Sequence, residues 1–227
     1  MSETSYDTTW DHLYGGGSFA RAPYDFVMSF IYRRAPKGVG RNQVRVLEVG
    51  CGAANNLWFA ALEGFSVSGV DGSEAAIAEG RRRLAQAKLE GNLRVADFTE
   101  LPFDDQAFDL AIDRGALTCT GTKSMHKAIG EIHRVLKPGG FFLYNPISDT
   151  DTSYRSGTPG PDDVTQDIKA GDFQGVGQIR FVSRREIDMF LSPKLWTFER
   201  IERVEIVDML NPLGKVISNW RVEAVRK

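Results

Sequence analysis

The stretch from Val46 to Asn55 reads VLEVGCGAAN, an apolar run that ends in two glycines one residue apart. A helix-like pattern of apolar residues follows at once, over residues 57–62. This order predicts a buried parallel strand, a tight turn and the N-terminus of a helix. Because glycine lacks a Cβ and accepts positive φ, a ligand can lie against the backbone of such a turn. The helix N-terminus adds unpaired N–H groups and a partial positive charge, so the turn suits a nucleoside or a small carboxylate.

A second strand is predicted for residues 65–70, and it ends in Asp71-Gly72. An acid at this place, about twenty residues after the glycine turn, is positioned to accept hydrogen bonds from both hydroxyls of a ribose. Ser73 fits as the N-cap of the helix that follows. Short glycine motifs recur by chance, so the combination of turn and acid is what indicates a nucleoside site.

These pieces resemble the class I S-adenosylmethionine-dependent methyltransferases. The motifs that carry the resemblance are EVGCG at 48–52, GVDGS at 69–73, VADF with LPF at 95–103, FDLAID at 108–113 and HRVLKPGG at 133–140. They occur in the family's order over roughly residues 44–146, which makes the set far more specific than any one motif. The resemblance implies a doubly wound, Rossmann-like α/β fold with a mostly parallel sheet of seven strands, the last one antiparallel.

The same resemblance implies S-adenosylmethionine as cofactor and S-adenosylhomocysteine as product. The residues expected to bind the cofactor are Trp10, Arg21, Glu48, Gly50, Cys51, Gly52, Asn55, Asp71, Gly72, Ser73, Asp97, Phe98, Asp113 and Arg114. In this family the acid at the Asp97 position accepts a hydrogen bond from the adenine amino group, and the apolar neighbour, here Phe98, lies against the ring. Glu48 is expected to bind the cofactor's amino group or to fix the loop from below.

Several of these positions have two interpretations. Arg21 is either a surface cation or a fork on the cofactor's carboxylate. Asn55 either presents its side chain to the ligand or stabilises the turn by local hydrogen bonds. Asp97 can serve as a turn residue instead of an adenine ligand. Arg114 either pairs with Asp113 or helps to position an anionic acceptor.

The N-terminal region, residues 1–40, is expected to hold a lid and a helix. Trp10 and Tyr14 are four residues apart, which places them on one face of a short helix, as an arm packed on the core or as a lid. A helix is predicted from Ala22, with Pro23 in its first turn and residues 38–40 at its end.

The remaining chain is divided by its composition. Residues 44–146 form the expected cofactor-binding core, in which Arg81–Arg83 read as a solvated helix face and Gly91 as the helix end. Residues 147–182 are rich in Asp, Ser, Gly and Pro, and we expect a lid or disordered loop that belongs to the acceptor site. Residues 183–227 begin with a capping box, followed by predicted strands at 196–208 and 218–224. No internal repeat or second domain is visible, so residues 1–227 are read as a single domain.

Composition limits the choice of function. The chain has 227 residues, 42% hydrophobic and 26% charged, with a formal net charge of −2. These values are typical of a globular domain and disfavour a broad polyanion-binding face, so no DNA partner is expected. Two cysteines make no disulfide framework, no apolar run approaches the roughly 18 residues of a membrane span, and no secretory signal is visible, which favours the cytoplasm. The three histidines have no metal-ligand spacing, so no metal is expected.

The sequence therefore predicts an enzyme that transfers a methyl group to an O or N atom of a small molecule, such as a sugar, an amine or a natural-product intermediate. The cofactor brings the reactivity, and no constellation of residues stands out as a base, so we assign no catalytic residue. Alternatives are a protein or RNA acceptor, or a non-catalytic cofactor-binding module. A nicotinamide oxidoreductase is disfavoured because the turn lacks the third small residue. We expect a monomer or a homodimer, with no membrane partner.

Overall fold

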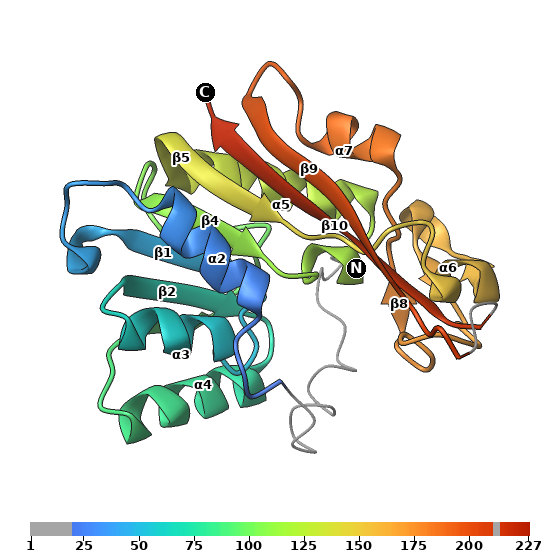
Figure 1. Ribbon diagram of the computed structural model, residues 1–227, viewed down its shortest axis with the longest axis horizontal. Helices are drawn as coiled ribbons and strands as arrows, with labels where there is room; N and C mark the ends of the chain where they lie inside the picture. Colours follow the sequence, from blue (N-terminus) through green and yellow to red (C-terminus); the bar gives the residue numbers. More distant parts are fainter. Residues whose placement is uncertain (1–19, 211–213) are drawn as a thin grey trace.

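The computed structural model of the chain describes residues 20–210 and 214–227 (Figure 1). The predictions for Trp10 and Tyr14 lie outside these residues.

A seven-stranded sheet organises the molecule, with strand order β3-β2-β1-β4-β5-β10-β9. Neighbouring strands from β3 to β5 pair in parallel, and β10 is antiparallel to both β5 and β9. Every strand of this sheet except β10, the last one in the sequence, therefore runs in the same direction. The predicted fold is confirmed. The strands are β1 (Arg45–Val49), β2 (Ser66–Asp71), β3 (Asn92–Val95), β4 (Phe108–Asp113), β5 (Leu136–Tyr144), β9 (Trp196–Val207) and β10 (Val216–Arg226).

Helices cover both faces of this sheet (Figure 1). Alternate side chains of β1 divide between two cores, since Val46 packs with α2, α3 and α4 whereas Leu47 packs with α5 and α7. This alternation is the period-2 pattern of a strand that is buried on both sides. The helices are α2 (Asp25–Arg34), α3 (Asn55–Leu62), α4 (Glu74–Gln86), α5 (Thr122–Val135) and α7 (Arg184–Phe190), with 3-10 turns η1 (Arg41–Gln43) and η2 (Leu117–Cys119).

Helix α2 is shorter at both ends than predicted. It begins at Asp25, two residues after Pro23, and it ends at Arg34 instead of at the glycines of residues 38–40. Ala35 already has extended backbone angles, with φ −56° and ψ 134°. The reason is Pro36, because a residue that precedes proline is forced out of the helical region.

Helix α4 ends differently from the prediction as well. Lys88, with φ 55°, takes the left-handed position that we assigned to Gly91. The N–H of Leu89 then bonds to the carbonyl of Leu84, which closes the helix in a Schellman motif. Gly91 instead leaves room for the side chains of Leu84 and Val67.

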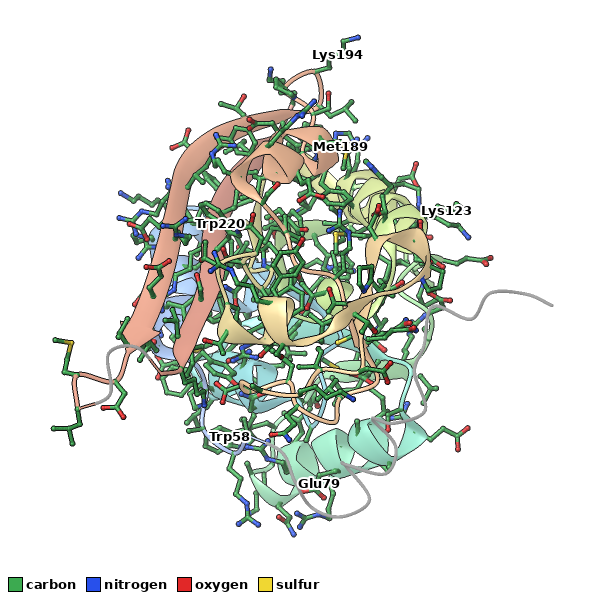
Figure 2. The ribbon with its side chains drawn as sticks, turned by 90° about the vertical axis from the view of Figure 1, so that its right-hand side faces the viewer. Trp58, Glu79, Lys123, Met189, Lys194 and Trp220 are labelled. Atoms are coloured by element: carbon green, nitrogen blue, oxygen red, sulfur yellow. The ribbon has the colours of Figure 1, made fainter. Side chains whose placement is uncertain are left out.

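Residues 147–182 are folded, in contrast to the predicted disordered loop, and their role as a lid stays a prediction. They contain α6 (Thr152–Ser156), the turn η3 (Pro161–Asp163) and a three-stranded antiparallel sheet of β6 (Thr158–Pro159), β7 (Thr165–Gln166) and β8 (Gln178–Ile179). Ile168, Ile179 and Phe181 form a small core of their own. Trp220, labelled in Figure 2, anchors the end of this segment to β10 by donating from Nε1 to the Val182 carbonyl at 2.7 Å.

The capping box at α7 is confirmed, since Ser183 and Glu186 bond reciprocally to each other's backbone N–H. Within the part of the chain that the structure describes, every helix is too short or too polar to cross a bilayer.

Candidate functional site

The turn after β1 has an unusual backbone. Gly50, Gly52 and Ala54 all have positive φ, at 62°, 52° and 58°. The N–H of Cys51 bonds to the carbonyl of Val70, which holds the turn against the end of β2. A methyl group at Gly50 would overlap the Cβ of Ala116, so close packing against the loop after β4 requires this glycine. The turn is thus fixed on two sides by the ends of neighbouring strands.

Asp71 lies beside this turn, at the end of β2. Its Oδ2 accepts a hydrogen bond from the Gly52 N–H at 2.8 Å, and its Oδ1 accepts one from the Ser73 N–H at 2.9 Å. Ser73 in turn caps α4 by accepting from the Ala76 N–H. The carboxylate therefore faces the glycine turn, as a ribose-binding acid has to, and it joins the turn to the start of α4.

Glu48 is a buried carboxyl group at the end of β1, with 2% of its surface exposed. Its Oε1 accepts a hydrogen bond from Asn56 Nδ2 at 2.7 Å. Its Oε2 is also buried but has no hydrogen-bond partner among residues 20–210 and 214–227. Burial raises the pKa of Glu48 to about 8, and the bond from Asn56 and the charge of Arg114 only partly oppose this rise.

Asp113, at the end of β4, repeats this pattern on the next strand. Its Oδ1 accepts from the N–H groups of Ala116 and Leu117, at 2.8 and 3.0 Å. Its Oδ2 is buried and finds no partner in the described parts of the chain. Burial raises the pKa of Asp113 to about 6, against the opposing effect of these backbone N–H groups.

Arg114 does not pair with Asp113, which was one of the two interpretations from the sequence. Its guanidinium lies over the ring of Tyr24, 3.8 Å from the ring centre, in a cation–π contact. It remains exposed, and its charge is close enough to lower the pKa values of both Glu48 and Asp113. A role toward an anionic acceptor stays a prediction.

Two side chains, Asn55 and Arg83, bind the segment before α2 to the region of the glycine turn. Asn55 donates to the carbonyl of Ala22 at 2.8 Å instead of bonding within the turn, and its contact with a ligand stays a prediction. Arg83 donates to the carbonyls of Ala53 and Arg21, at 2.8 and 2.6 Å, and is therefore more than a solvated cation. Arg21 itself is exposed at this edge, and its predicted contact with a carboxylate is untested.

Asn56 is the residue that the sequence analysis missed. It is 1% exposed, and it accepts a hydrogen bond from the Tyr24 N–H at 2.9 Å while it donates to Glu48. The available signal was a polar residue at the second position of an apolar helix, directly above a buried strand that ends in an acid. Asn56 thus couples the entry to α2 to the carboxyl group of Glu48.

The predicted adenine-binding residues follow β3. Asp97 accepts from the Thr99 N–H at 2.7 Å, which makes it a turn residue in this structure. Phe98 is partly buried against the core, and the N–H of Ala96 bonds to the carbonyl of Asp71. Contact of Asp97 and Phe98 with a base stays a prediction.

The side chain of Cys51 is turned into the core. It is 2% exposed and packs in the core beneath β2, where Gly69 leaves space for its sulfur. Burial raises the pKa of this thiol well above its usual value. The backbone of Cys51 is therefore the part that can serve a ligand on the turn, and its contact with the cofactor stays a prediction.

Glu48, Asp71 and Asp113 together make the end of the sheet acidic. They lie in the last two residues of the adjacent strands β1, β2 and β4, and the pKa of Glu48 is raised in part by the charges of the other two. Such a group suits a ligand that carries positive charge beside a nucleoside. The described residues contain no group of three or more His, Cys, Asp or Glu arranged to hold a metal ion.

Comparison with known proteins gives one matching family. Residues 46–140 match the family described as a methyltransferase domain. The rice (Oryza sativa subsp. japonica) protein named 24-methylenesterol C-methyltransferase 2 is 30% identical over 177 residues, which cover 70% of this chain and 48% of the rice protein. The chain spans about half, or less, of the length of the curated relatives it matches.

Solved structures agree on the fold. A methyltransferase structure from Methanosarcina mazei superposes with a TM-score of 0.71 at 20% identity, covering 91% of this chain and 98% of that one. The 1,6-didemethyltoxoflavin-N1-methyltransferase of Burkholderia thailandensis, solved with its namesake compound and S-adenosylhomocysteine, gives 0.70 at 17% identity, covering 97% and 86%. Residues 46–140 thus match a methyltransferase domain, and the chain has the class I, Rossmann-like fold of the S-adenosylmethionine-dependent methyltransferases.

Proposed function

We propose that the protein binds S-adenosylmethionine at the glycine turn and transfers its methyl group to a small-molecule acceptor. One observation carries the proposal: the Asp71 carboxylate accepts a hydrogen bond from the Gly52 N–H of the turn at 2.8 Å. This places an acid at the end of β2 directly beside a bare backbone, as nucleoside binding requires.

The charge of the site fits the cofactor. S-adenosylmethionine supplies a methyl group activated by a cationic sulfonium, and it also carries an ammonium group. Glu48 and Asp113 each keep one buried oxygen without a hydrogen-bond partner among the described residues. A buried, unsatisfied carboxylate oxygen is costly, and a cationic ligand can remove that cost.

The chain's own residues then have distinct tasks. Asp71 binds the ribose hydroxyls, and Glu48 and Asp113 provide negative potential for the cationic end. Asn56 holds Glu48 in place, and the bonds of Asn55 and Arg83 keep the segment before α2 on the turn. These residues bind, orient and exclude water, which is the main contribution that a protein makes to an in-line displacement. We assign no base.

For the acceptor we propose an O or N nucleophile on a small molecule. The B. thailandensis protein of similar fold is named 1,6-didemethyltoxoflavin-N1-methyltransferase, which supports this choice. The folded segment of residues 147–182 lies after β5, at the same edge of the sheet as the glycine turn, and we propose that it forms part of the acceptor site.

A second candidate is methyl transfer to carbon. It is favoured by the rice relative, which is named as a C-methyltransferase and matches 70% of this chain. An alkene acceptor has no proton to lose before it attacks, so the two candidates predict different acceptors and different methylated atoms.

Two experiments test the proposal in order. Calorimetry with S-adenosylhomocysteine and S-adenosylmethionine tests the cofactor, and absence of binding at high concentration would reject it. A screen with radiolabelled methyl donor then compares amines, phenols, sugars and alkenes, and mass spectrometry locates the new methyl group. Labelling of protein or RNA in place of these acceptors would reject the small-molecule class, and cofactor binding without any turnover would indicate a non-catalytic module.

We also propose a monomer or homodimer in the cytoplasm, without DNA as a partner. The two thiols, Cys51 and Cys119, are not bonded to each other, which is compatible with a reducing compartment.

A further inference from the structure

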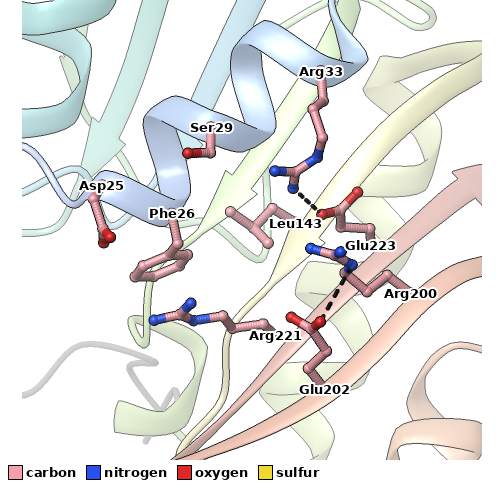
Figure 3. Close-up of a pocket in the computed structure, with 9 residues that line it drawn as sticks. All are labelled: Asp25, Phe26, Ser29, Arg33, Leu143, Arg200, Glu202, Arg221 and Glu223. Carbon is pink, nitrogen blue, oxygen red and sulfur yellow. Dashed lines mark hydrogen bonds and ion pairs between the residues drawn. The ribbon is translucent and has the colours of Figure 1, made fainter.

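A cavity of about 150 Å³ lies between α2 and the β9–β10 hairpin, on the face of the sheet covered by α2 (Figure 3). Nothing in the proposed methyl transfer uses it. Its lining is highly charged, with Asp25, Ser29 and Arg33 on α2 and Arg200, Glu202, Arg221 and Glu223 on the hairpin, beside Phe26 and Leu143.

The buried acid of this cavity is already neutralised. Glu223 is 2% exposed, and it accepts from Arg33 at 2.5 Å through one oxygen and from Arg34 at 2.6 Å through the other. Both carboxylate oxygens therefore have a cationic donor. Arg34 also pairs with Glu199 at 3.5 Å, so the charges in this part of the wall are balanced.

Arg221 is the cation that lacks such a partner. Its guanidinium lies 4.2 Å from the ring centre of Phe26 (Figure 3). It forms no ion pair with any residue of the described ranges, and its buried Nε has no hydrogen-bond partner there. A buried donor of a charged group is rarely left unsatisfied, and an ion or a water that is not part of the chain is a usual explanation. Stacking on Phe26 leaves the edge of the guanidinium, with its planar donors, available to an oxyanion.

Glu202 is a carboxylate of the cavity itself that can compete with a bound anion for Arg221. It is the cross-strand partner of Arg221 in the β9–β10 pairing, yet its carboxylate lies 3.5 Å from Arg200. Its side chain is 44% exposed, so it is screened by water and can be displaced. Asp25 also lies at the rim and disfavours an anion. The balance of charges therefore predicts a weak site whose affinity depends on Glu202.

We propose that this cavity binds a small oxyanion, either a phosphate or a carboxylate group, with Arg221 as the anchor and Arg33 and Arg200 as further donors. The bound group joins α2 to the hairpin, because Arg33 belongs to the helix and the other two arginines belong to the strands. A ligand that bridges two elements of the folded state, and cannot do so in the unfolded chain, stabilises the fold.

The test measures thermal stability and calorimetric binding with inorganic phosphate and, separately, with acetate. Sodium chloride at equal ionic strength controls for screening. We expect a saturable rise in Tm with one or both oxyanions beyond the effect of chloride. Whether phosphate or acetate gives this rise shows which of the two groups the cavity binds. Arg221→Gln is expected to weaken binding by roughly tenfold, the loss of one charge-assisted hydrogen bond. Glu202→Gln is expected to strengthen it.

Two further variants keep the test decisive. Arg221→Lys retains the charge but not the planar fork, so an intermediate affinity is expected even if Arg221→Gln folds poorly. Arg184→Gln removes an exposed arginine of α7 on the opposite face of the sheet and should leave binding unchanged. The proposal is overturned if chloride reproduces the rise in Tm, if Arg221→Gln and Arg221→Lys bind as tightly as the natural chain, or if Glu202→Gln binds more weakly.

Discussion

Asn56 Nδ2 donates to Glu48 Oε1 over 2.7 Å, and both residues are almost fully buried. The bond joins the second residue of α3 to the penultimate residue of β1, while the Asn56 Oδ1 accepts from the Tyr24 N–H. One amide group therefore holds three separated parts of the chain at the edge of the proposed cofactor site.

Asn56→Ala removes both of these bonds at once. It leaves two buried oxygens of Glu48 and one partly buried N–H of Tyr24 unsatisfied, so we expect the free energy of unfolding to fall by about 2–4 kcal/mol. Urea denaturation measures this, with Asn55→Ala as the matched control. Asn55 makes one bond at an exposed site, and its loss should cost about 1 kcal/mol or less. Equal losses for the two variants would contradict the central role of Asn56.

Glu48 and Asp113 give the protein a defined pH dependence. Their folded pKa values of about 8 and about 6 lie above the unfolded values of 4.5 and 3.8. The folded chain therefore holds more protons than the unfolded chain between pH 4 and 8, and stability falls as pH rises through this window. We expect Glu48→Gln to flatten the upper part of the fall, between about pH 6 and 8. Denaturation at several pH values checks this, and a slope unchanged in Glu48→Gln would contradict the assignment.

Cofactor binding should have the opposite pH dependence. A cationic ligand favours the ionised carboxylates, so affinity for S-adenosylmethionine should rise as Glu48 and Asp113 lose their protons, and protons should be released on binding. Calorimetry in two buffers of different ionisation enthalpy measures the protons released near pH 7. Glu48→Gln should reduce that number, whereas an unchanged proton release would show that the ligand does not meet Glu48.

Asp71 is the residue whose loss should affect cofactor binding most directly. Asp71→Asn keeps the shape but directs an NH2 group at one of two N–H donors, Gly52 or Ser73. We expect affinity for S-adenosylhomocysteine to fall by at least about tenfold, with a smaller loss of stability. Glu74→Gln, three residues later on the exposed first turn of α4, is the matched control. Binding that survives Asp71→Asn unchanged would place the nucleoside elsewhere.

The fold could be predicted from the sequence because its decisive features are local and periodic. The strand of residues 46–49, the glycine turn, the Ser73 cap and the capping box at Ser183 each follow from neighbouring residues, and each is found in the structure. Residues 147–182 could not be predicted in this way. Their strands are two residues long and are stabilised by packing among Ile168, Ile179 and Phe181, which are irregularly spaced in sequence.

The same distinction applies to the candidate site. The acids at strand ends follow from motif spacing, but their partners come from distant parts of the chain. Tyr24 reaches Asn56 across 32 residues, and Arg83 reaches Arg21 across 62. The three arginines of residues 81–83 cannot be distinguished in the sequence. Only tertiary packing shows that Arg83 bonds to the turn, whereas Arg82 pairs with Glu79 on the surface.

Gly50 offers the sharpest test of how the turn is built, because two separate constraints act on it. Its φ of 62° disfavours any side chain, and a Cβ would overlap the Cβ of Ala116. Gly50→Ala should therefore lose about 1–2 kcal/mol from backbone strain and a further 1–3 kcal/mol from overpacking. Ala116→Gly in the same chain removes only the second constraint, so the double variant should recover part of the stability. As a control, Gly130→Ala in the exposed part of α5 meets no atom within 4 Å and should stabilise the protein by about 0.5–1 kcal/mol. If Ala116→Gly rescues nothing, backbone strain alone explains the glycine, and the close contact between the ends of β1 and β4 does not hold the turn in place.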